Sequence, residues 1–293
     1  MNYRHSYHAG NFADVVKHLA EIAILEHLAK KDAPFAVIDS HAGRGLYDLG
    51  SEQARKTGEA AAGIERLQGL SGPALLDRYL ALVADTGNDG ASARAGATTN
   101  NDGASARAGA TTKYYPGSPL IAARLLRPQD RLVAIEKHPE EAVLLTQVLA
   151  PWRKARVEEG DGYARLLALL PPPERRGLVL IDPPFEAVDE FETAARTVRD
   201  AVRKFATGIY LIWYPIKSEA AGNAFVGEVL AAGTSKAIKI EIGIDAPDGK
   251  LGRAGLLVLN PPFLFDAEMK AALGKVAPLL QARARLEWLA GQA

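Results

Sequence analysis

The sequence contains no cysteine and only two methionines among its 293 residues. Without a thiol the protein cannot form disulfides, hold zinc or an iron–sulfur cluster through thiolates, or use a cysteine nucleophile. The missing nucleophile also excludes covalent addition to a pyrimidine ring. What remains is chemistry that needs neither a thiol nor a thiolate-bound metal.

An excess of charge and long apolar runs are also absent. The 35 Lys+Arg residues balance the 35 Asp+Glu residues, so binding to a polyanion would need a local basic face. No run approaches the ~18–20 apolar residues of a membrane helix, and the polar, aromatic N-terminus differs from a signal peptide. We therefore expect a cytoplasmic protein with no membrane partner.

Short apolar runs that favour strands alternate with helical patterns along most of the chain. Asn11 is predicted to be the N-cap of a first helix. Ser118 is predicted to be the N-cap of another helix, with Pro119 at its first position. The alternation predicts an α/β fold with a mostly parallel central sheet and helices on both faces. The expected strands are 35–39, 131–136, 155–158, 177–181, 208–214, 236–244 and 255–259, and the expected later helices are 118–126, 139–149, 162–170, 188–205, 218–232 and one at the C-terminus.

The spacing of two candidate ligand-binding residues predicts an insertion. Gly45 follows the first strand and Glu136 ends the second, far beyond the usual separation of about 20 residues. We therefore expect residues 1–50 and 114–293 to form the main domain and residues 51–113 to form an inserted helical subdomain.

A short segment is duplicated inside this insertion. Residues 88–99 recur, residue for residue, as residues 101–112. Their Gly, Ala, Ser, Thr and Asn composition cannot bury a core, so we expect a flexible surface loop over 88–112.

Ligands in such sheets bind at the carboxyl ends of the strands. Gly43 follows the first strand, where a glycine lets backbone N–H groups approach a ligand, although the incomplete glycine pattern disfavours a dinucleotide oxidoreductase. Glu136 could bind two ribose hydroxyls or could be a solvated residue before a helix. Asp161, followed by Gly162, could bind an adenine amino group or could only cap a helix.

The most specific loop is Asp182-Pro183-Pro184-Phe185, directly after an apolar strand. Proline has no N–H to donate, so nearby carbonyl oxygens stay available as acceptors. The Asp182 carboxylate and the Pro183 carbonyl could accept hydrogens from an exocyclic amine and localise its lone pair on nitrogen. Phe185 could stack on a base removed from its helix. A purely structural turn is the alternative.

A second loop, Asn260-Pro261-Pro262-Phe263, has a similar pattern. We favour Asp182 over Asn260 because the strand before Asp182 should lie beside the first strand, at the switch point where ligands bind. We expect Asn260 to have a structural role.

In these motifs the chain resembles the 23S rRNA (adenine-N6)-methyltransferase J family, within the S-adenosylmethionine-dependent, Rossmann-like methyltransferases. The resemblance extends over the chain apart from the duplicated loop. It rests on residues 3–11, 14–18, 39–43, 114–122, 160–162, 182–185, 203–210 and 213–215.

The resemblance implies S-adenosylmethionine as the cofactor and N6-methylation of a specific adenine in 23S rRNA as the reaction. It implies Asp182, Pro183 and Phe185 as the catalytic loop, and Tyr3, His5 and Phe185 as contacts to the substrate base. The family usually has tyrosine where Phe185 stands. The implied cofactor contacts are Lys17, His18, His41, Gly43, Ser118, Glu136, Asp161, Gly162 and Asp182.

Three further expectations complete this interpretation. No metal is needed, although His5 and His8 lie close together in the sequence. The substrate would be rRNA before full assembly of the subunit, and the enzyme would act as a monomer. The alternatives are an adenine-N6 methyltransferase for DNA or another RNA, and a non-catalytic RNA-binding assembly protein. Candidate phosphate contacts are Arg4, Arg44, Arg153, Lys154, Arg156, Arg175 and Arg176.

Overall fold

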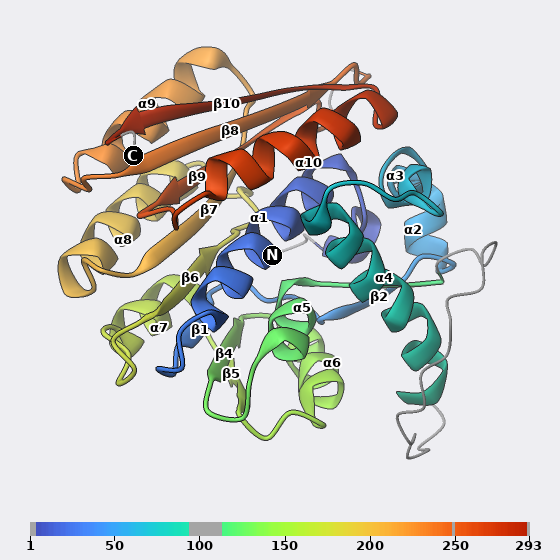
Figure 1. Ribbon diagram of the computed structural model, residues 1–293, viewed down its shortest axis with the longest axis horizontal. Coiled ribbons are helices and arrows are strands. Elements are labelled where there is room, and N and C mark those ends of the chain that lie inside the picture. The colour runs from blue at the N-terminus through green and yellow to red at the C-terminus, as the bar shows by residue number, and fades with distance from the viewer. Residues whose placement is uncertain (1–3, 94–112, 248–249, 292–293) are drawn as a thin grey trace.

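An eight-stranded sheet lies at the centre of the computed structural model, which describes residues 4–93, 113–247 and 250–291. The strand order is β10-β8-β9-β7-β6-β1-β4-β5 (Figure 1). Neighbours from β5 to β7 are parallel, whereas β9 is antiparallel to β7 and β8, and β10 is antiparallel to β8. The expected mostly parallel sheet is confirmed. The strands are β1 Ala36–Asp39, β4 Arg131–Glu136, β5 Ala155–Glu159, β6 Gly177–Ile181, β7 Ile209–Pro215, β8 Ala237–Ile244, β9 Arg253–Leu259 and β10 Ala282–Ala290.

Helices cover both faces of this sheet and enclose two apolar cores. Leu178 and Leu180 of β6 point into one core, and Val179 and Ile181 point into the other. A strand buried on both faces reads as a continuous apolar run, which is why β6 was predictable. One face carries α1 Phe12–Ala29, α5 Ser118–Leu125, α6 Pro139–Leu149 and α10 Phe265–Leu279, and the other carries α7 Gly162–Leu169, α8 Glu190–Lys204 and α9 Glu219–Leu230.

The segment between the first two sheet strands is largely helical, as expected, but it is framed by a small antiparallel sheet that the sequence did not indicate. This sheet pairs β2, Leu46–Asp48, with β3, Tyr114–Pro116. The division into domains stays a prediction. The helices here are α2 Glu52–Thr57, α3 Glu59–Ala62, η2 Ile64–Leu67 and α4 Ala74–Ala93, after a first short helix, η1 His5–Tyr7, at the N-terminus.

Two expectations about chain segments need correction. Helix α4 continues to Ala93, so the first residues of the duplicated segment are helical rather than loop. Residues 94–112, the rest of that segment, lie outside the described residues. The chain also does not end in the expected helix, because β10 follows α10 and pairs with β8. As an edge strand with polar exposed positions, β10 lacks the apolar pattern of a buried strand.

Within the described ranges, no helix is both long and apolar enough to cross a membrane.

Candidate active site

Acidic side chains at the ends of neighbouring strands meet at one edge of the sheet. Asp39 ends β1, Glu136 ends β4 and Asp182 follows β6. Strand β1 pairs in parallel with both β4 and β6, so these three carboxyl ends are adjacent. The expected place of the Asp182 strand beside β1 is therefore confirmed.

Asn260 lies at the opposite edge, because β9 runs antiparallel to β7. Its amide donates hydrogen bonds to the carbonyl oxygens of Ala206, at 2.9 Å, and Gly208, at 2.8 Å, where the chain enters β7. The second Pro-Pro turn thus fastens one strand end to another, which is the structural role expected for Asn260.

The N-terminus of α1 reaches the edge that carries Asp182. Asn11 caps α1 as predicted, with its side chain accepting from the backbone N–H groups of Ala13 and Asp14. Asp14 in turn accepts from the backbone N–H of Gly10 at 2.9 Å, and His5 Nε2 lies 2.9 Å from the same carboxylate. The cap therefore places a buried carboxylate beside the first turn of the helix.

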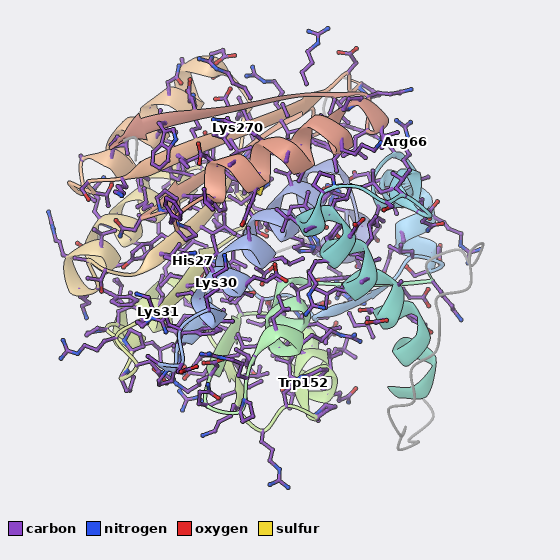
Figure 2. All side chains as sticks on the ribbon, viewed as in Figure 1. His27, Lys30, Lys31, Arg66, Trp152 and Lys270 are labelled. Carbon is purple, nitrogen blue, oxygen red and sulfur yellow. The ribbon has the colours of Figure 1, made fainter. Side chains whose placement is uncertain are left out.

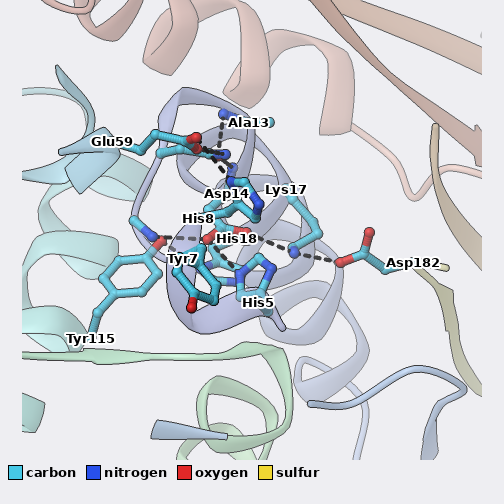
Figure 3. Close-up of polar contacts among 12 residues, drawn as sticks. His5, Tyr7, His8, Ala13, Asp14, Lys17, His18, Glu59, Tyr115 and Asp182 are labelled. Atoms are coloured by element: carbon cyan, nitrogen blue, oxygen red, sulfur yellow. Dashed lines mark hydrogen bonds and ion pairs between the residues drawn. The ribbon is translucent and has the colours of Figure 1, made fainter. Parts of the chain in front are cut away.

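Lys17 joins this carboxylate to the Pro-Pro loop. Its Nζ donates to Asp14 Oδ1 at 2.8 Å and to Asp182 Oδ2 at 2.6 Å (Figure 3). Burial opposes the charge on Lys17, but the two carboxylates outweigh it and hold the pKa of Lys17 well above its usual value. Burial likewise opposes ionisation of Asp14, yet His5 and Lys17 hold the pKa of that carboxyl well below its usual value.

A first cavity, of about 70 Å³, lies beside this network. Its wall includes seven of the nine predicted cofactor contacts, and Asp161 and Gly162 are not among them. The seven are Lys17, His18, His41, Gly43, Ser118, Glu136 and Asp182.

Two of these residues hold the ends of neighbouring strands in place. Ser118 is not the N-cap of α5, which is Gly117; its hydroxyl instead donates to Asp39 Oδ2 at 2.7 Å. Burial raises the pKa of Asp39 to about 7, although the bond from Ser118 opposes this. Glu136 accepts from the backbone N–H of Gly43 at 2.8 Å, which brings the glycine loop against β4.

The two predicted cofactor histidines are uncharged near neutral pH. Burial lowers the pKa of His18 to about 3, and the charge of Lys17 adds to the effect. Burial also lowers the pKa of His41 to about 4. His18 Nδ1 is paired with the Tyr115 hydroxyl at 2.8 Å, whereas its Nε2 is buried without a hydrogen-bond partner. A buried polar atom of this kind at a cavity wall is suited to a ligand.

Asp161 and Gly162 do not line the cavity and both have a role in the packing of α7, so their contact with the cofactor stays a prediction. Asp161 caps α7 by accepting from the backbone N–H groups of Tyr163 and Ala164, the helix-capping alternative that the sequence left open. A Cβ on Gly162 would lie 2.0 Å from the carbonyl oxygen of Ser40 and 2.9 Å from His41 Nε2. Only glycine therefore lets α7 approach the loop after β1 so closely.

A second cavity, of about 640 Å³, adjoins the first and shares His5, Lys17, Asp182 and Pro184 with it. Pro183, Phe185 and Trp213 lie on the wall of the second cavity. The Asp182 carboxylate thus stands between two cavities, an arrangement suited to moving a group from one bound molecule to another.

Phe185 is held tightly at the edge of this second cavity. Its φ of 51° is in the left-handed region that favours glycine, and the side chain is only 5% exposed. Its ring centroid lies 4.5 Å from that of Phe191, 5.9 Å from that of Trp213 and 6.1 Å from that of Phe225. These contacts stabilise the loop, and the stacking of Phe185 on a base stays a prediction.

Comparison with known proteins identifies the family. The sequence model of a family described as ribosomal RNA large subunit methyltransferase D, RlmJ, matches residues 32–97 and 104–290. The ribosomal RNA large subunit methyltransferase J of Escherichia coli K12 is 38% identical over 296 residues, which cover 99% of each chain. The chain belongs to the ribosomal RNA large subunit methyltransferase J family.

Two further relatives extend this result. The methyltransferase of the same name from Haemophilus influenzae is 36% identical over 93% of this chain and 92% of its own. A crystal structure of a Legionella pneumophila protein matches with a TM-score of 0.82 and 33% identity, covering 96% of this chain and 98% of that one. The α/β fold with its mostly parallel sheet is therefore that of the family.

Several basic residues proposed as phosphate contacts lie away from the Asp182 edge of the methyltransferase. Arg175 and Arg176 precede β6, and Arg176 donates to the carbonyl oxygens of Leu28 and Ala33. Figure 2 shows His27, Lys30 and Lys31 near the C-terminal end of α1, beside the edge where β6 begins, which is opposite the Asp182 edge. Arg153, Lys154 and Arg156 lie around the start of β5, also at that edge.

Sequence reasoning missed two groups of residues in the methyltransferase site. Trp213, Lys217 and Lys250 line the second cavity although none was among the predicted site residues, and Asp14, which bonds Lys17, was not among them either. Trp213 lies near the end of β7, next to β6, so the rule that drew attention to Asp182 could have found it. Tyr3 lies outside the described residues, and within them no cluster of His, Asp and Glu could hold a metal ion.

Proposed function

We propose that this methyltransferase transfers the methyl group of S-adenosylmethionine to N6 of a specific adenine in 23S rRNA. The observation that carries the proposal is the position of Asp182 and its Pro-Pro loop between two adjoining cavities, next to the glycine loop of β1. The names of the relatives supply the substrate class, ribosomal RNA of the large subunit.

The residues of the first cavity suit the cofactor. Neutral His18 offers an unpartnered Nε2, and Glu136 offers a carboxylate at the end of the second strand, where ribose hydroxyls bind in many nucleoside sites. When bound, S-adenosylmethionine supplies an activated methyl group on a sulfonium ion. A cavity of about 70 Å³ is below the ~300 Å³ of common ligand pockets, so binding requires it to widen. Arg4 lines this cavity and forms an ion pair with Glu140 at 2.9 Å.

The second cavity suits an adenine that has left its stack. Asp182 and the Pro183 carbonyl would accept the two N6 hydrogens and direct the nitrogen lone pair towards the first cavity. Trp213, which is partly exposed on the wall, offers a larger surface for stacking than buried Phe185. Lys217, Lys250 and Arg253 surround the same cavity and could bind phosphates next to the target nucleotide.

Positioning accounts for most of the expected rate acceleration, because the reacting nitrogen and methyl group are brought into line. The amine nitrogen becomes acidic only as it gains the methyl group, so Asp182 need not be a strong base beforehand. Asp182 then takes the N6 proton. Pro183, with no N–H of its own, keeps its carbonyl oxygen free for the second hydrogen.

The test is transfer of labelled methyl from S-adenosylmethionine to protein-free 23S rRNA that lacks modification, followed by nucleoside analysis. Labelled N6-methyladenosine that is absent with Asp182→Ala would support the proposal. Assembled large subunits serve as a matched substrate, since the proposal expects transfer to free rRNA and little to the assembled particle. Transfer only to DNA or to another RNA would show that 23S rRNA is not the substrate. Cofactor binding without any transfer would favour an assembly role. A protein that does not bind the cofactor would overturn the proposal.

A further inference from the structure

Asp14 lies at the centre of a buried polar network, although neither its sequence motif nor the family comparison assigns it a role in the reaction. The residue is only 2% exposed. One carboxylate oxygen faces the backbone N–H of Gly10 and His5 Nε2, both at 2.9 Å, and the other accepts from Lys17 Nζ at 2.8 Å. Figure 3 shows Lys17 between Asp14 and Asp182.

The charges in this network differ from those of a simple ion pair. With Asp182 and Lys17 alone, the carboxylate would be neutralised by the ammonium group 2.6 Å away. Asp14 contributes a second carboxylate to the same ammonium, so Asp14, Lys17 and Asp182 by themselves carry one negative charge, while His5 faces Asp14 at its other oxygen. In a buried setting such a charge acts over several ångströms with little screening.

The net charge matters because methyl transfer moves positive charge onto the amine nitrogen. In an Asp182–Lys17 pair the ammonium offsets part of the negative charge of the carboxylate, and a less negative carboxylate is a weaker acceptor for the amine hydrogens. Sharing the ammonium with Asp14 leaves Asp182 more negative and a better acceptor. Asp14 also fixes the direction of the Lys17 side chain, because the two contacts lie on either side of Nζ.

We propose that Asp14 is a positioning residue for methyl transfer, which acts through Lys17 by sharing its ammonium group and so preserving the negative charge of Asp182. This inference rests on the proposed function, because it concerns the step in which the adenine nitrogen is methylated. Asp14 also lies on the wall of the second cavity, but in this role it acts through Lys17 and not through its own contact with the substrate.

Asp14 also accepts from Gly10 at the start of α1, so the test must separate positioning from folding. Asp14→Asn keeps the size and an acceptor oxygen but removes the charge. Asp14→Ser is the second variant, should the amide disturb the helix start. Glu59→Gln is the matched control, because Glu59 pairs with nearby His8 at 2.9 Å and Asn11 at 3.0 Å without contacting Lys17.

The measurement is the single-turnover rate of methyl transfer to protein-free 23S rRNA, together with the Kd for S-adenosylmethionine. We expect Asp14→Asn to slow transfer about tenfold to a hundredfold, with the Kd changed by no more than about twofold. The Glu59→Gln protein should transfer at the wild-type rate. An equal loss of rate and cofactor affinity in the Asp14 variants would indicate a structural role only and overturn the inference.

A double-mutant cycle tests the route through Lys17. In a Lys17→Met protein no ammonium neutralises Asp182, so adding Asp14→Asn should slow transfer by no more than about threefold. Full additivity of the two losses would contradict the proposal. Failure of wild-type protein to methylate adenine would instead refute the proposed function, which separates the two hypotheses.

Discussion

Two loops of this protein have nearly the same sequence, yet they lie at opposite edges of the sheet. Asp182-Pro183-Pro184-Phe185 follows a parallel strand beside β1 and borders two cavities. Asn260-Pro261-Pro262-Phe263 follows an antiparallel strand, and its aromatic ring is 71% exposed. The difference teaches that the Pro-Pro pattern sets a stiff turn, whereas the direction of the preceding strand decides whether that turn can take part in chemistry.

The largest effect on methyl transfer is expected from substitutions at the first residues of the two turns, Asp182 and Asn260. Asp182→Asn replaces a proton acceptor with an amide, and we expect methyl transfer to fall by at least about a hundredfold. Asn260→Asp lies at the far edge and should leave transfer within about twofold of wild type. Single-turnover transfer with both variants measures this, and an equal loss in the Asn260 variant would show that the comparison of the two edges is wrong.

Asp39, at the same edge of the sheet as Asp182, should make the free energy of unfolding depend on pH. The pKa of Asp39 is raised by burial to about 7, above its ordinary value of 3.8. Between these values the unfolded chain loses a proton that the folded protein keeps, so Asp39 lowers stability progressively as pH rises from about 4 to about 7.

Asp39→Asn removes this dependence. The stability of the variant relative to wild type should therefore increase by up to a few kcal/mol over that pH range and level off above it. Urea denaturation of both proteins at several pH values is the measurement. Asn260→Asp, which contributes no such buried group, is the control, and parallel pH curves for wild type and Asp39→Asn would contradict the prediction.

The aromatic residues near the two turns should differ in their effect on substrate binding. Trp213→Ala removes a stacking surface from the second cavity, and we expect the KM for rRNA to rise about tenfold, with a smaller change in kcat. Phe263→Ala removes an exposed ring at the other edge and should change neither value by more than about twofold. Steady-state kinetics with both variants distinguishes stacking from packing, because a loss confined to kcat would argue against a base-binding role for Trp213.

The smallest effect is expected on folding at the Asn260 turn. Asn260→Ala loses two hydrogen bonds and places alanine at a φ of 53°, so we expect a loss of about 1–2 kcal/mol in the free energy of unfolding. Asn260→Gly accepts this backbone conformation and isolates the contribution of the hydrogen bonds. Thermal and urea unfolding provide the values, and a large loss of methyl transfer in either variant would be unexpected.

Much of the site could be predicted from local patterns. The apolar run before Asp182 marked a strand buried on both faces, and the alternation of strands and helices placed that strand beside β1. Because parallel strands end at a shared edge, Gly43, Glu136 and Asp182 could be assigned to one place without a structure. Asn11 was predictable as a cap because capping depends only on its nearest neighbours.

Other features had no local pattern to reveal them. Strand β10 is an edge strand whose exposed positions carry arginines, and β2 and β3 are only three residues each, so their pairing depends on contacts distant in the chain. Ser118 resembled a cap, but a buried carboxylate on β1 attracted its hydroxyl instead.

By itself, the sequence determined the alternating α/β architecture, the stiffness of both Pro-Pro turns and the family to which the chain belongs, because these depend on short-range patterns of apolar, proline and glycine residues. Only the tertiary structure decided which turn borders the cavities and which fastens two strand ends. It also decided that Lys17 lies between Asp14 and Asp182, two residues that are 168 positions apart in the sequence. The physical reason is that burial and charge are properties of all the groups that surround a side chain, and folding brings those groups together from distant parts of the chain.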